Sequence, residues 1–278
     1  MTAAIILVIA AAVIAVLLGR PLWQAHRRRQ LRARPLPAAW RAHLERALPF
    51  YGAMPAALRA RLDGLVQQFL AEKEFVGCRG LEVSLEMKLT IAAQACLLVV
   101  NRPMHVYDDL YSVLIYPAAF IAPDEHHDEA GVVHRHDQVL SGQTWDTHRI
   151  ILSWDDVQAS AAERGAGFNV VYHEFAHYLD AEDGGVNGAP LLGEAAHYER
   201  WSKVLNEEFE KLRAAAARNE ATLIDPYGAE DPGEFFAVVT ETFFELPVEL
   251  RDEHAALYEE FRRFYRLDPA DWFQPAHP

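Results

Sequence analysis

Apolar residues recur along most of the chain at intervals of three and four, which is the spacing of one face of a helix. Short runs of β-branched and aromatic residues, which are typical of strands, are fewer. The helices predicted in this way cover residues 39–75 (with breaks at two prolines), 84–100, 194–217, 234–246 and about 250–265. The predicted strands are residues 113–116 and 149–154. The pattern indicates an α+β fold that is mostly helical and contains a small sheet.

The longest unbroken apolar run occupies residues 3–18, and six arginines follow it within residues 20–34. This run is slightly shorter than the roughly 17–25 residues that usually span a bilayer, but Thr2 and Gly19 extend it at little cost. The alternatives are a cleaved signal peptide, which normally has basic residues before its apolar core, and a buried N-terminal helix. We expect a single transmembrane anchor. The predicted domains are the anchor at residues 1–19, a basic, proline-containing linker at residues 20–37 and the catalytic domain at residues 38–278.

Charge is distributed unevenly along the chain. Six of the 26 Lys and Arg residues lie within residues 1–34, so the remainder has 20 basic residues against all 40 acidic residues. The positive-inside rule then predicts a single-pass protein of the inner (cytoplasmic) membrane, held through residues 3–19, with its catalytic domain in the cytoplasm. An acidic body without a basic patch argues against direct binding of nucleic acid. The two cysteines, Cys78 and Cys96, are expected to be small buried apolar residues.

The strongest chemical signal is the pentapeptide His173-Glu174-Phe175-Ala176-His177. Residues i and i+4 share one face of a helix, so the two imidazoles can reach one Zn²⁺ at about 2.0–2.1 Å. Glu174 can then contact a zinc-bound water and act as its general base. Chance could also produce this pattern in a surface helix. The apolar flanking residues favour the metal, because buried imidazoles and a buried carboxylate are costly without a partner.

A catalytic zinc normally has three protein ligands, so a third ligand is expected. The extended metzincin pattern is excluded, because Asp180 and Asp183 stand where it needs Gly and His. The best candidate is Glu234, in the first turn of a predicted helix that begins at Asp231 and Pro232. The alternative is a capping box, in which Glu234 only bonds back to the backbone of Asp231.

Several segments together resemble a known family, the Mlc titration factor A peptidases, and more distantly the catalytic domain of anthrax lethal factor. Both belong to the gluzincin class of zinc peptidases, whose third ligand is a glutamate. The matching segments are residues 173–180, Tyr227, residues 231–238, residues 113–117, residues 141–145, residues 264–265 and residues 268–269. The resemblance covers about residues 40–270, and its motifs are specific when taken together.

The resemblance implies a zincin-like metallopeptidase with its sheet beside the HExxH helix and one zinc per chain. His173, His177 and Glu234 would be the zinc ligands, and Glu174 the base. Tyr227 would stabilise the oxyanion. Without the family spacing, a loop aromatic packed over a helix start would be the preferred interpretation of this residue. Aminopeptidase action on peptides or peptide-like substrates is the implied activity. The alternative is a zinc-containing binding protein that sequesters a transcriptional regulator, an Mlc-like repressor.

Two questions stay open at the level of sequence. Many gluzincins carry a carboxylate one turn after the glutamate ligand, where this chain has Val238. Asp180 or Glu241 is predicted to replace it as the partner of an imidazole, although either is also consistent with a solvated carboxylate. The histidine-rich segment of residues 126–136 is interpreted as a solvated loop rather than a second metal site.

Overall fold

The structure is a computed structural model of the 278-residue chain. It describes residues 19–118, 120–127, 133–140, 142–146, 148–163 and 165–273. The helices are α2 (Ala38–Ala47), α3 (Ala56–Glu72), α4 (Leu85–Leu98), α5 (Trp154–Ala162), α6 (Val170–Asp180), α7 (Ala195–Ala217), α8 (Pro232–Glu245), α9 (Pro247–Glu253) and α10 (Ala255–Tyr265). Short 3₁₀ helices are η1 (Met104–Tyr107), η2 (Ala181–Asp183), η3 (Pro226–Ala229) and η4 (Pro269–Asp271). The strands are β1 (Glu74–Gly77), β2 (Ser112–Tyr116), β3 (Phe120–His127), β4 (Val133–Leu140), β5 (Gly142–Asp146) and β6 (Arg149–Ser153).

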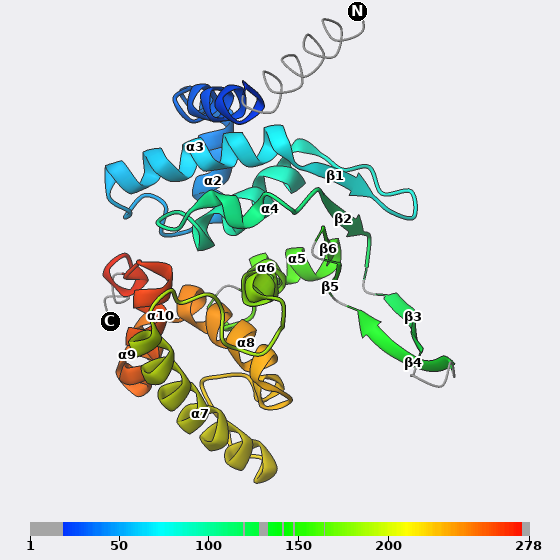
Figure 1. Ribbon diagram of the computed structural model, residues 1–278, viewed down its shortest axis with the longest axis vertical. Coiled ribbons are helices and arrows are strands. Elements are labelled where there is room, and N and C mark those ends of the chain that lie inside the picture. Colours follow the sequence, from blue (N-terminus) through cyan, green and yellow to red (C-terminus); the bar gives the residue numbers. More distant parts are fainter. Residues whose placement is uncertain are drawn as a thin grey trace, which may run out of the picture.

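One sheet has the strand order β1-β2-β6-β5. The strands β1, β2 and β6 are parallel, and β5 pairs with β6 in the antiparallel direction at the edge. Val113 and Ile115 of β2 pair with Ile150 and Leu152 of β6, and all four are fully buried. The strands β3 and β4 form a separate antiparallel ribbon that extends away from the helices (Figure 1). The prediction of a mostly helical fold with a small sheet is therefore confirmed.

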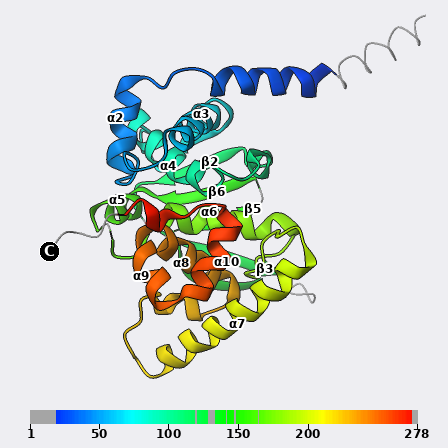
Figure 2. The ribbon, with the colours of Figure 1, turned by 90° about the vertical axis from the view of Figure 1, so that its left-hand side faces the viewer.

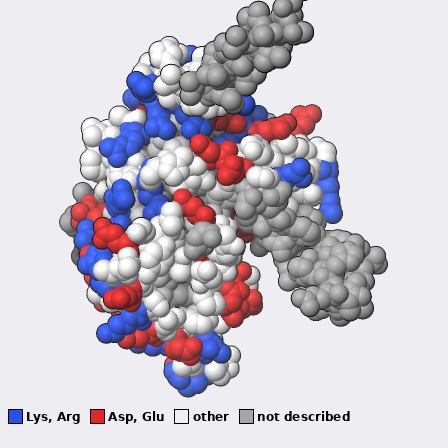
Figure 3. Space-filling view, in the orientation of Figure 1, with Lys and Arg blue, Asp and Glu red and all other residues white. Residues whose placement is uncertain are grey.

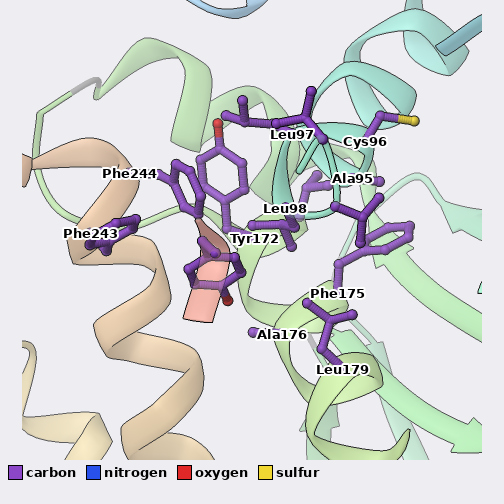
Figure 4. Packing of buried hydrophobic residues seen from close by; sticks show 14 of the residues in the cluster. Ala95, Cys96, Leu97, Leu98, Tyr172, Phe175, Ala176, Leu179, Phe243 and Phe244 are labelled. Atoms are coloured by element: carbon purple, nitrogen blue, oxygen red, sulfur yellow. The ribbon is translucent and has the colours of Figure 1, made fainter. Parts of the chain in front are cut away.

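The HExxH helix α6 occupies the centre of the molecule. In both ribbon views α3 and α4 lie toward one end, α7 to α10 lie toward the other, and α6 lies between them with the sheet (Figures 1 and 2). From α6, Tyr172 packs against Phe244 of α8 with 5.1 Å between ring centroids, and Phe175 packs against Phe69 of α3 at 6.0 Å. Figure 4 shows Tyr172 between Phe244 and Leu97 of α4. Because burying each large aromatic contributes about 1.5–3 kcal/mol, this packing fixes α6 firmly between its neighbours.

Charged side chains of both signs are interspersed on the surface of the C-terminal helices. On the face shown in Figure 3, acidic and basic residues alternate over α7, α9 and α10. Exposed pairs one helical turn apart occur on α7, such as Glu210 with Arg213. Pairs of this kind contribute little to stability, typically below about 1 kcal/mol, so the apolar core carries the fold.

The segment predicted as a basic linker is partly helical. Residues 19–32 form a helix that lies against α3. The guanidinium of Arg28 binds Glu72 at 2.9 Å and Asp108 at 2.7 Å. A Cβ atom at Gly64 would lie 2.9 Å from the carbonyl oxygen of Arg32, so the glycine permits this close approach. The arginines of this segment are typical of a solvated linker when the sequence is considered alone. In the structure, the long-range ion pairs of Arg28 hold the segment against the rest of the protein. The domain boundary near residue 37 stays a prediction.

The predicted location in the inner membrane, as a single-pass protein with a cytoplasmic catalytic domain, needs correction. Within the described part of the chain, no helix is both long enough and apolar enough to cross a bilayer. The longest helix, α7, has 23 residues but is rich in charge, and the apolar helices α4 and α8 have only 14 residues each. Fourteen helical residues span about 21 Å, against about 30 Å of hydrocarbon. The predicted anchor, residues 1–19, lies outside the described residues except for Gly19.

Candidate metal centre

The helix α6 begins at a strong cap and carries both histidines of the motif. The side-chain oxygen of Asn169 accepts hydrogen bonds from the backbone N–H groups of Val171 and Tyr172, each at 3.2 Å. One turn later, His173 and His177 lie on the same face, with 4.7 Å between ring centroids. Their Nε2 atoms are 3.1 Å apart. The local structure therefore brings the Nε2 atoms of both imidazoles close enough to contact one metal ion.

Glu234 reaches the same point from α8. This helix starts with Asp231 as its cap, whose carboxylate accepts from the backbone N–H groups of Gly233 and Glu234. The carboxylate oxygen Oε2 of Glu234 lies 3.1 Å from Nε2 of His173 and 3.4 Å from Nε2 of His177. The cap is therefore formed by Asp231, and the side chain of Glu234 is turned toward the histidines.

These three residues suit a metal ion. One ligand atom from each of His173, His177 and Glu234 lies within 4.8 Å of the other two. Ligands of a tetrahedral zinc at about 2.0–2.1 Å stand roughly 3.3 Å apart, close to the separation of the two Nε2 atoms. The buried oxygen Oε2 of Glu234 faces both imidazoles but forms no well-aligned hydrogen bond with either. Two imidazoles and one carboxylate are also the donor types that zinc accepts in catalytic sites.

Glu174 is buried next to this cluster. Its side chain is 3% exposed, and its Oε2 atom has no hydrogen-bond partner. Burial raises the pKa of this carboxyl to about 7, although the neighbouring His173 and His177 act in the opposite direction. A carboxyl with a pKa near neutrality can both accept and return a proton, which is what general acid–base catalysis needs.

Tyr227 lies on η3, at the exposed side of the cluster. The side chain of Asp225 caps η3 by accepting from the backbone N–H of Tyr227 at 2.8 Å. The ring centroid of Tyr227 is 6.0 Å from that of His173, and the residue is 47% exposed. Burial of the hydroxyl and the nearby Glu234 carboxylate raise the pKa of this phenol well above its usual value. It therefore stays protonated and available as a donor.

Glu241 is placed as the partner of His173. Its Oε1 atom lies 2.8 Å from Nδ1 of His173, and the residue is 2% exposed. Asp180, the other candidate for this position, is fully buried and accepts a hydrogen bond from the backbone N–H of Gly188 at 2.7 Å. The structure thus connects Glu241 to the cluster and Asp180 to the loop that follows η2.

Asn169 joins α6 to α8 beside the cluster and was not among the predicted site residues. Besides capping α6, its backbone N–H donates to the Oε2 atom of Glu241. Its side-chain Nδ2 donates to Glu245 at 2.9 Å. The one sequence signal that could have revealed it is its position just before an apolar helical stretch, where asparagine is a common N-cap. The contacts to α8 join residues 72 and 76 positions apart, and no local pattern reveals them.

Comparisons with known proteins agree with this geometry. The family model described as glucose-regulated metallo-peptidase M90 matches residues 22–266. Protein slr2042 of Synechocystis sp., which carries no functional name, is 41% identical over 267 residues, covering 96% of this chain and 97% of that protein. Mlc titration factor A of Salmonella arizonae is 36% identical over 228 residues, covering 81% of this chain and 89% of that protein. The protein of the same name from Salmonella typhimurium is also 36% identical, with 84% of its length covered.

Proposed function

This chain belongs to the family of glucose-regulated metallo-peptidases M90, and on that premise we propose that it is a zinc-dependent peptidase of aminopeptidase type. The observation that carries the proposal is the convergence of His173, His177 and Glu234 within 4.8 Å, from two helices that are distant in sequence. These three residues would hold one zinc ion per chain. The similarity to Mlc titration factor A identifies the family, while the choice of metal and substrate is the proposal.

Zinc held by these residues would supply Lewis acidity. It would polarise the scissile carbonyl and lower the pKa of water to near neutrality. Glu174 accepts the proton of the attacking water and returns it to the leaving amine, a role that suits a buried carboxylate beside the cluster with an oxygen free of hydrogen bonds. The phenol of Tyr227 donates a hydrogen bond to the carbonyl oxygen as that oxygen gains negative charge. Glu241 accepts from Nδ1 of His173 and so keeps Nε2 of this imidazole facing the site.

The charges around the site support a substrate with a free amino terminus. Asp225 and Glu230 cap the two ends of η3, the 3₁₀ helix that carries Tyr227 at the exposed side of the cluster. Neither is buried. A substrate ammonium group is attracted to such surroundings, whereas a carboxylate is repelled. We therefore favour cleavage next to the amino terminus of short peptides.

Glu174→Gln tests this proposal, because it keeps the shape of the side chain and removes its ability to accept a proton. The full chain and the variant would be compared by metal analysis and by hydrolysis of free and N-acetylated peptides. We expect both proteins to hold about one zinc. Turnover of free peptides should fall at least 100-fold in the variant. The exposed Glu199→Gln on α7 is the matched control.

Normal turnover in Glu174→Gln would refute the mechanism, and equal cleavage of N-acetylated peptides would refute the aminopeptidase assignment alone. The name of the relatives, Mlc titration factor A, suggests a regulator protein as a further partner. If sequestration is the main function, Glu174→Gln keeps its affinity for the regulator while peptide hydrolysis is lost. Binding assays on the same two proteins separate the two functions.

A further inference from the structure

The loop of residues 184–193, which follows η2, is fixed against the first turn of α8. The buried carboxylate of Asp180 accepts from the backbone N–H of Gly188 at 2.7 Å. The indole N–H of Trp201 donates to the carbonyl oxygen of Gly188 at 2.8 Å. Gly188 has a φ of +75°, and a Cβ atom there would collide with the carbonyl oxygen of Pro232. Because glycine alone permits this approach, the loop has one defined position beside the start of α8.

Val186 belongs to this loop and lies next to the candidate ligand Glu234. A Cβ atom at Gly233 would lie 2.7 Å from Cγ1 of Val186, so the missing side chain of Gly233 makes room for the valine. Gly233 directly precedes Glu234. Val186 is nevertheless 50% exposed. Single exposed apolar side chains are ordinary, but a fixed loop holds this one beside a candidate metal ligand.

Val186 and Tyr227 lie at opposite ends of the candidate metal centre. The ring centroid of Tyr227 is 6.0 Å from that of His173. Val186 lies instead on the side of Asp180, because a Cβ atom at Gly233 would contact both of these side chains. His173 and Asp180 are seven residues apart on α6, which corresponds to about 10 Å along the helix axis. A peptide that crosses the centre along α6 therefore meets Tyr227 at one end and Val186 at the other.

We propose that Val186 determines specificity for the residue that follows the cleaved bond, and that it favours a large apolar side chain there. This inference rests on the proposed function. Asp225 and Glu230, at the ends of η3, attract the substrate ammonium group to the end of the centre where Tyr227 lies. The leaving part of the peptide then extends toward Val186. Contact between the exposed methyl groups of Val186 and a large apolar side chain removes more apolar surface from water than contact with glycine does.

Hydrolysis of Ala-Xaa-Gly-Gly peptides by the full chain tests the proposal, with Leu, Gly or Asp as the second residue. Mass spectrometry identifies the cleaved bond. We expect kcat/KM for the leucine peptide to exceed that for the glycine peptide at least tenfold. Val186→Ala should reduce this ratio several-fold, and Val186→Lys should shift the preference toward the aspartate peptide. Leu85→Ala is the matched control, since this apolar residue is 48% exposed at the start of α4, and it should leave the ratio unchanged.

Peptide binding separates this inference from the proposed function. The leucine and glycine peptides would be titrated calorimetrically against Glu174→Gln and against the double variant Glu174→Gln with Val186→Ala. If the unchanged chain cleaves no peptide, the proposed function fails. Tighter binding of the leucine peptide to Glu174→Gln, lost in the double variant, would still support a specificity role of Val186.

Three results would overturn the inference. The first is that the unchanged chain cleaves, and Glu174→Gln binds, the leucine and glycine peptides equally well. The second is that Val186→Ala lowers kcat/KM for both peptides by the same factor, which assigns Val186 a purely structural role. The third is that neither peptide is cleaved by the unchanged chain or bound by Glu174→Gln.

Discussion

The Nδ1 atom of His173 lies 2.8 Å from the Oε1 atom of Glu241, inside the packed interface of α6 and α8. Glu241 stands two turns after Glu234 on α8, so one helix supplies both a candidate ligand and the residue that orients another. The bond fixes His173 with Nε2 facing Glu234, and the second carboxylate oxygen is held by the backbone of Asn169. Such outer partners tune a metal site as strongly as some ligands do.

Glu241→Gln should weaken zinc binding about 10–100-fold, because the amide orients and polarises His173 less well than the carboxylate does. Competition with a fluorescent chelator measures the zinc dissociation constant. Glu249→Gln, on the exposed side of α9, is the matched control and should bind zinc normally. If the zinc dissociation constant of Glu241→Gln is unchanged, Glu241 only packs between α6 and α8 and does not influence the metal.

The second prediction concerns metal content. Purified protein should contain about one zinc per chain, because three protein ligands and one water complete a tetrahedral site. His173→Ala and His177→Ala should abolish zinc retention, and Glu234→Ala should weaken it sharply. Mass spectrometry of metals after dialysis gives the occupancy, with the exposed His105→Ala as control. If Glu234→Ala keeps full zinc occupancy and normal turnover, Glu234 is not a zinc ligand and acts only at the start of α8.

The convergence of three ligand candidates was predictable only in part from the sequence. His173 and His177 are four residues apart, so the helix alone brings them together. Glu234 and Glu241 lie 57 or more residues further along. Its place in the first turn of a predicted helix made Glu234 a candidate, and the family resemblance favoured a ligand over a capping residue. Between Asp180 and Glu241 the sequence could not decide, since each is an acid at helical spacing. The distance across the α6–α8 interface depends on side-chain packing that no local pattern contains.

Parts of the fold were missed for similar reasons. The strand β5 has the polar sequence of residues 142–146, and its backbone bonds to β6 define it rather than any apolar run. The strand β1 was not predicted, because it has only four residues and its first two fell within the predicted helical region that ended at residue 75. Residues 126–136, interpreted as a loop, fall partly on the strands β3 and β4. Short strands at edges are specified by their neighbours more than by their own residues.

Tyr227→Phe should lower kcat about 10–1,000-fold with little change in KM, because the hydroxyl bonds an oxygen that gains charge only in the transition state. Steady-state kinetics on a free peptide measure both constants. Tyr111→Phe is the matched control, since this tyrosine is 60% exposed and lies outside the site. Unchanged kcat in Tyr227→Phe would leave the residue with a packing role only.

The last prediction concerns stability at low pH and the contact of α7 with α10. Glu208 is 9% exposed and accepts from Nδ1 of His254, which caps α10, at 2.7 Å, and from Lys211. Burial alone would raise the pKa of Glu208, but these two donors outweigh it and lower the pKa. A lowered pKa in the folded state means that the stabilisation is complete above the ordinary value of about 4.3 and is lost as the pH falls further.

Glu208→Gln should therefore reduce the free energy of unfolding by about 1 kcal/mol at pH 7, a modest figure because Lys211 is mostly exposed to solvent. The difference from the unchanged chain should shrink as the pH falls from 5 to 3.5, where the carboxylate becomes protonated. Urea unfolding at each pH measures it, and Glu210→Gln, which is 65% exposed at its side chain, should change little throughout. A difference that stays constant over this range would assign Glu208 a packing role, because only the ionised carboxylate attracts His254 and Lys211 as a charge.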